Sequence, residues 1–79
     1  MSRDLRTVLI SMLTQVPYDD ELFTILHSGL ESVEFAAPEM ITFWWNEIAY
    51  RLNAALPQVD KLLPWQRVVV EIFQGQRLE

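Results

Sequence analysis

The sequence contains no cysteine among its 79 residues. This absence excludes a disulfide scaffold, a thiolate metal site and a cysteine nucleophile, and it is typical of proteins from a reducing compartment. We therefore expect a cytoplasmic protein. The sequence also has only two glycines, which excludes a glycine-rich loop that cradles phosphates.

Catalytic motifs are lacking as well. His27 is the single histidine, and its neighbour Ser28 would point about 100° away on a helix, so the two do not form a nucleophile–base pair. The acidic run 19–21 lacks the alternating ligands and the glycine turn of a calcium loop, and we interpret it as helix capping. We expect no enzyme, no metal and no cofactor, and we interpret His27 as a surface residue.

Positive charge is scarce. Six Lys and Arg face eleven Asp and Glu, which gives a net charge of −5 and argues against a protein that binds nucleic-acid phosphates. Long apolar runs are missing too. The longest stretch without a charged residue, from Thr7 to Tyr18, contains polar side chains and is too short for a membrane span, which needs about 20 mostly apolar residues. We expect neither nucleic acid nor a membrane as a partner.

The length permits one hydrophobic core. We expect a single helical domain over residues 1–77, because a second core would not fit in so short a chain. Residues 78–79 resemble the remnant of a C-terminal purification tag. Apolar residues make up 51% of the chain, which is too rich for a disordered protein.

Four prolines divide the chain, and apolar residues recur at helical spacing between them. The first predicted helix covers residues 3–16, with Ser2 as its N-cap and Pro17 after its end. Ile10 lies off its apolar stripe. The residues of that stripe are spaced i, i+3, i+4, i+7, i+8 and i+11: Leu5, Val8, Leu9, Met12, Leu13 and Val16.

The second predicted helix covers residues 20–28. Asp19 is placed to cap it, and Gly29 suits the left-handed position just after a helix. Residues 31–37 follow as a connecting loop or a single turn, with Phe35 packed beneath it. The buried stripe of this helix contains Leu22, Ile25 and Leu26.

The third predicted helix is the longest and covers residues 38–56. It has a main apolar stripe and a second apolar strip of Met40, Phe43 and Tyr50, so apolar side chains occupy much of its circumference. Residues 57–63 are predicted as a turn with one short helix, and a last helix covers residues 64–74, with Gly75 as its stop. The fold class is therefore all-α: a compact up-and-down bundle of four or five short helices with one long central helix.

Acidic side chains gather in the middle of the chain. Residues 7–50 contain no Lys or Arg and most of the Asp and Glu. This distribution fits ordinary solubility and helix capping, and it also fits a surface that steers a basic partner. An acidic inhibitor or antitoxin-like protein that covers a basic surface is therefore an alternative function.

Aromatic residues are the second signal. Phe43, Trp44 and Trp45 are consecutive and fan across about 200° of a helix. So small a core can hardly enclose all of them, and we expect at least one of Phe43, Trp44, Tyr50 and Trp65 to be partly exposed. Two alternatives are that every ring packs internally and that the rings line an enclosed cavity of about 300 Å³ or more in a small-molecule or lipid carrier.

The favoured interpretation is a small non-enzymatic protein–protein interaction domain, either an adaptor or a homodimerising module. Its partner is another protein or a second copy of the chain. The predicted partner-binding residues are aromatic and acidic side chains. All but one lie on the predicted helix 38–56, and Trp65 lies on the predicted helix 64–74: Phe43, Trp44, Trp45, Tyr50, Trp65, Glu39 and Glu47.

Overall fold

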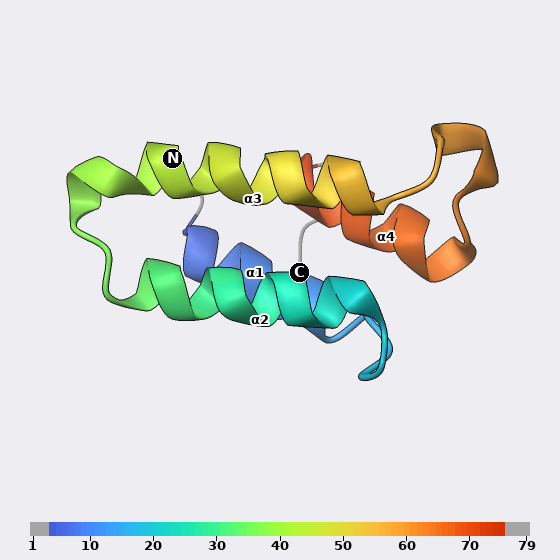
Figure 1. Cartoon of the computed structure of the whole chain (residues 1–79), viewed down its shortest axis with the longest axis horizontal. Helices are drawn as coiled ribbons and strands as arrows, with labels where there is room; N and C mark the ends of the chain where they lie inside the picture. Colours follow the sequence, from blue (N-terminus) through green and yellow to red (C-terminus); the bar gives the residue numbers. More distant parts are fainter. Residues whose placement is uncertain (1–3, 76–79) are drawn as a thin grey trace.

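The computed structural model describes residues 4–75 and contains no strand within them (Figure 1). The predicted all-α class is confirmed. The elements in chain order are α1 (Leu5–Leu13), α2 (Glu21–Glu34), the 3-10 turn η1 (Pro38–Met40), α3 (Ile41–Ala55), the 3-10 turn η2 (Val59–Lys61) and α4 (Pro64–Phe73).

Successive α-helices run in opposite directions, as expected for an up-and-down bundle (Figure 1). α1 packs against both α2 and α4, and α2 also packs against α3. The connections are short: three residues separate α2 from η1, and eight residues, three of which form η2, separate α3 from α4. This arrangement leaves one side of α3 without a neighbouring helix.

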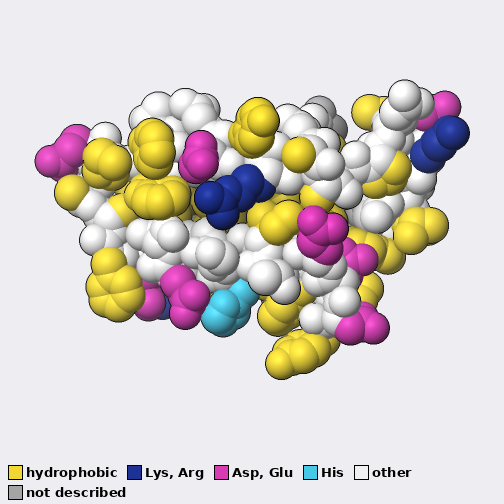
Figure 2. Space-filling model, in the orientation of Figure 1, with side chains coloured by type: hydrophobic (Ala, Val, Ile, Leu, Met, Phe, Trp, Pro, Cys, Tyr) yellow, Lys and Arg dark blue, Asp and Glu magenta, His cyan; other side chains and the backbone are white. Residues whose placement is uncertain are grey.

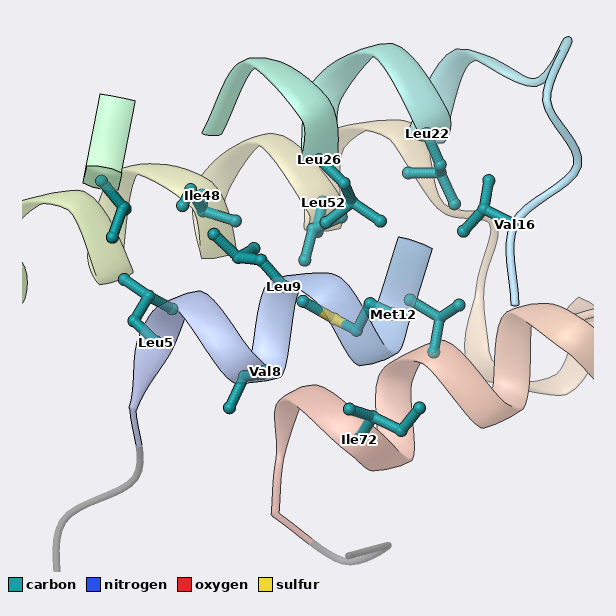
Figure 3. Close-up of a cluster of buried hydrophobic side chains, with 12 residues drawn as sticks. Leu5, Val8, Leu9, Met12, Val16, Leu22, Leu26, Ile48, Leu52 and Ile72 are labelled. Carbon is teal, nitrogen blue, oxygen red and sulfur yellow. The ribbon is translucent and has the colours of Figure 1, made fainter. Parts of the chain in front are cut away.

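The core forms around α1 and not around the long third helix that the sequence predicts as central, because α1 packs against both α2 and α4. Its buried side chains, Leu5, Val8, Leu9 and Met12, are at most 4% exposed and meet side chains from α2, α3 and α4 (Figure 3). Each such aliphatic side chain contributes on the order of 1.5–3 kcal/mol by leaving water. Among residues 4–75 no polar or charged residue is buried. The predicted stripe of the first helix is confirmed, with one member, Leu13, only partly buried.

Aspartates begin the first two helices. The Asp4 carboxylate accepts hydrogen bonds from the Arg6 N–H (3.2 Å) and from the Thr7 hydroxyl (3.0 Å), and the Asp20 carboxylate accepts one from the Leu22 N–H (2.9 Å). The predicted cap Ser2 lies outside the described residues. The prediction of Asp19 as a cap is wrong, because a turn closed by the Asp20 N–H and the Pro17 carbonyl places the cap one residue later.

The second helix is longer than predicted. α2 continues through Gly29 to Glu34, so the predicted stop at Gly29 is wrong. Gly29 is buried, and a Cβ at this position would lie 3.0 Å from Cδ1 of Ile48. The lack of a side chain at Gly29 therefore permits the close approach of α2 and α3. This packing favours the continuation of α2 beyond Gly29. The prediction for Phe35 is also wrong: it follows the longer helix and is 87% exposed.

The remaining predictions agree more closely with the structure. α1 is shorter than the predicted 3–16 span, because the N–H groups of Gln15 and Val16 close tight turns after it, although Val16 stays buried. The third helix begins with η1 and continues as α3, and the short helix predicted within 57–63 is η2. α4 ends at Phe73, and Gly75 adopts the expected positive φ of 81°.

The close approach at Gly29 generates the first prediction. Replacing Gly29→Leu forces the side chain of Ile48 and the α3 backbone outward, and we expect it to lower the free energy of unfolding by about 1–3 kcal/mol. Urea unfolding followed by far-ultraviolet circular dichroism measures this change. The control Ser28→Leu changes an exposed position on the same helix and should stay within about 0.5 kcal/mol of the parent. Equal midpoints for the two variants would contradict the close packing.

Candidate interaction surface

Large apolar side chains project from the outer side of α3 and the turn before it. Met40 is 41% exposed, Phe43 50% and Tyr50 74%. Together with Glu47 and Ala54, these residues are spaced by three, four, three and four positions, which places them in one row along a helix. We call Met40, Phe43, Glu47, Tyr50 and Ala54 the α3 strip. The expectation that an aromatic ring of this region is exposed is confirmed.

The opposite side of α3 holds the helix in the bundle. Ile48 and Leu52 are its two fully buried residues, and both point into the core (Figure 3). Tyr50 lies two residues from each of them, so it points about 160° away from both. The strip is therefore a rigid surface, because it is carried by a helix whose other side is fixed by packing.

The strip mixes apolar and charged side chains. Figure 2 shows hydrophobic side chains along the α3 side of the molecule, with an acidic and a basic side chain lying among them. The Glu47 carboxylate and the Arg51 guanidinium lie 3.7 Å apart, and their side chains are 41% and 52% exposed. Arg51 thus places one positive charge beside the strip.

The predicted partner-binding residues separate into two groups. Phe43, Tyr50 and Glu47 lie on the strip, and Glu39 is exposed beside its first residue. Trp44 is partly buried and meets Phe43 edge-on at 5.2 Å between ring centroids. These five residues lie on α3 and on the turn η1 before it.

The other two tryptophans lie elsewhere. The Trp45 ring stacks on Phe73 of α4 with a centroid distance of 4.7 Å and an interplanar angle of 24°. Trp65 is partly buried and packs against the core. Both residues hold α4 in the bundle and do not contribute to the α3 strip.

A hollow of about 230 Å³ lies beside the C-terminal half of the strip. Sequence reasoning missed it, because it forms only where α2 and α3 come together. It also missed Ala54, although the spacing of three and four residues through Met40, Phe43, Glu47 and Tyr50 extends to that position. The hollow is lined by Glu21, Ile25, Tyr50, Arg51, Ala54 and Ala55.

A second group of rings lies at the start of α2. Tyr18 is 85% exposed and contacts Phe23 at 5.0 Å between centroids, and Phe23 stacks on His27 at 6.3 Å. His27 Nδ1 lies 3.8 Å from a carboxylate oxygen of Glu31, an ion pair only when the imidazole is protonated. His27 is exposed, which confirms its interpretation as a surface residue.

Acidic side chains lie over α2, α3 and the connecting segments on the face shown in Figure 2. Two of them have basic neighbours: Glu47 pairs with Arg51, and Glu34 lies 3.7 Å from Arg6. Within residues 4–75 no three His, Asp or Glu side chains are placed to hold a metal ion.

No protein-family model, no curated protein and no solved structure matches the chain. Over the described part of the chain, no helix combines the length and the apolar character needed to cross a bilayer.

The two kinds of aromatic residue on α3 generate the second prediction. Trp45→Ala removes the stack on Phe73 and should lower the free energy of unfolding by about 2 kcal/mol. Phe43→Ala truncates a half-exposed ring and should cost less than about 1 kcal/mol. Thermal unfolding of both variants by circular dichroism compares them. A larger loss for Phe43→Ala would contradict the assignment of Trp45 to the bundle and Phe43 to the surface.

Proposed function

We propose that this chain is a small non-enzymatic protein–protein interaction domain that binds its partner through the α3 strip. The observation that carries this proposal is the exposure of Phe43 and Tyr50, at 50% and 74%, in one row on a helix. Single exposed apolar residues are common on protein surfaces, whereas aligned aromatic side chains are typical of binding sites.

The strip has the composition of a binding site. Aromatic side chains bury about 150–250 Å² each and supply a large share of interface energy. Phe43 and Tyr50 flank Glu47, so a charged group that can select the partner lies between the two apolar contacts. Because Ile48 and Leu52 already fix the helix, a partner would meet an ordered surface and lose little binding energy to ordering it.

The alternative of an acidic inhibitor has less support. Its binding surface would need unpaired carboxylates, and two of those on α2 and α3, Glu34 and Glu47, lie 3.7 Å from an arginine. The carrier alternative needs an enclosed apolar cavity, and the hollow beside the strip opens to the surface. The cytoplasmic location remains a proposal that rests on the absence of cysteine.

Photo-crosslinking in the native host tests the interaction surface. A benzophenone analogue of phenylalanine replaces Tyr50 in one variant and Tyr18 in the other. Both tyrosines are highly exposed, but Tyr18 lies off the strip, which makes it a matched control. We expect a discrete crosslinked species from position 50 and none of comparable yield from position 18.

Adding Phe43→Ser to the Tyr50 variant should reduce the yield of that species at least about tenfold, because loss of an aromatic contact at an interface costs more than about 1.4 kcal/mol. Equal adducts from both positions, or a yield that is indifferent to Phe43→Ser, would overturn the proposed surface.

A further inference from the structure

Both signs of charge occur at the middle of the binding surface. Glu47 and Arg51 lie one helical turn apart, with their charged groups at 3.7 Å and their side chains about half exposed. A partner surface of a single sign would place a like charge against one of them. A partner surface that carries the same two charges in reverse order places an opposite charge against each of them. A second copy of α3 in antiparallel orientation has that order.

The shape of the surface leads to the same partner. The Phe43 ring projects near the N-terminal end of α3, and the hollow of about 230 Å³ lies near its C-terminal end. Ala54 and Ala55 leave the hollow open, because their side chains are small. The surface therefore contains both a projecting ring and a space beside α2 that can receive one.

A single two-fold axis matches the charges and the shape together. Positions 47 and 51 are symmetric about residue 49, and so are positions 43 and 55. An antiparallel pair of α3 helices centred at that level thus sets each Glu47 against the other copy's Arg51 and brings each Phe43 to the level of the other copy's hollow. The alternation of three and four residues along the strip is the spacing that packs two helices at a small crossing angle.

We propose that two copies of this chain pack their α3 strips antiparallel and form a closed dimer in which each Phe43 enters the other copy's hollow. This inference rests on the proposed function and names its partner. Because both copies use the same surface, the contact closes on itself and does not extend into a filament.

Charge exchange at the strip tests the dimer. Sedimentation equilibrium of the full chain, from micromolar to millimolar concentration, should show a monomer–dimer equilibrium. In the dimer, position 47 of each copy faces position 51 of the other. Glu47→Arg alone therefore creates two pairs of facing positive charges, and Arg51→Glu alone creates two pairs of facing negative charges. Each variant should weaken association at least about tenfold. A one-to-one mixture of the two variants restores both opposite-charge pairs and should dimerise as the parent does.

The control for net charge is Glu31→Arg, which makes the same charge change on the exposed side of α2, away from the strip. It should leave the association unchanged. Circular dichroism of every variant confirms that the helices are retained. A mixture that stays monomeric while the parent dimerises would overturn the antiparallel arrangement.

The absence of cysteine permits a second measurement that does not depend on charge reversal. Glu47→Cys and Arg51→Cys are oxidised separately and as a mixture. The antiparallel arrangement predicts that the mixed disulfide between positions 47 and 51 forms in preference to either symmetric disulfide. Predominance of a symmetric disulfide would overturn the proposed axis.

The failure of this inference differs from a failure of the proposed function. A parent chain that is monomeric at every concentration overturns the dimer. If position 50 still crosslinks to a different protein, the interaction domain stands and its partner is not a second copy. If position 50 yields no discrete adduct either, the proposed surface falls as well.

Discussion

The enclosure of α1 by the other three helices is the contact on which the structure depends. α1 has nine residues, which is too short for a stable isolated helix in water, and four of them are almost completely buried. Its stability comes from packing against α2 and α4, with Ile48 and Leu52 of α3 completing the core. Because α1 takes the central place, α3 contributes only a narrow buried stripe and keeps a wide part of its circumference toward solvent.

That division explains why apolar side chains remain on the surface. The buried core of the described residues contains aliphatic side chains and Met12 but no aromatic ring. Rings instead occupy the edge of the core or the surface: Trp45 and Phe73 stack between α3 and α4, while Phe43 and Tyr50 project outward. The exposed rings of α3 differ from Phe35 because they share one helix face, and a row can form an interface where a single ring cannot.

The charges act on specificity more than on stability. The pairs Arg6–Glu34 and Glu47–Arg51 are both exposed, with charged groups 3.7 Å apart, so each contributes at most about 1 kcal/mol to folding. Charges within an interface instead set orientation and exclude unsuitable partners. The acidic character of the chain is therefore less informative about its partner than the one arginine that lies beside the strip.

The sequence alone determined the helical class, the prolines that separate the helices, the apolar stripe of α1 and the presence of more aromatic rings than a small core can hold. These depend on local spacing and on composition, which are visible without a fold. Tertiary structure decided that Gly29 continues a helix, because close approach to Ile48 compensates for a residue that favours helix ends. Tertiary structure also decided which rings of α3 are buried and where the hollow beside Ala54 forms. Both depend on how α2 and α4 are placed around α3, and no single segment of the sequence encodes that placement.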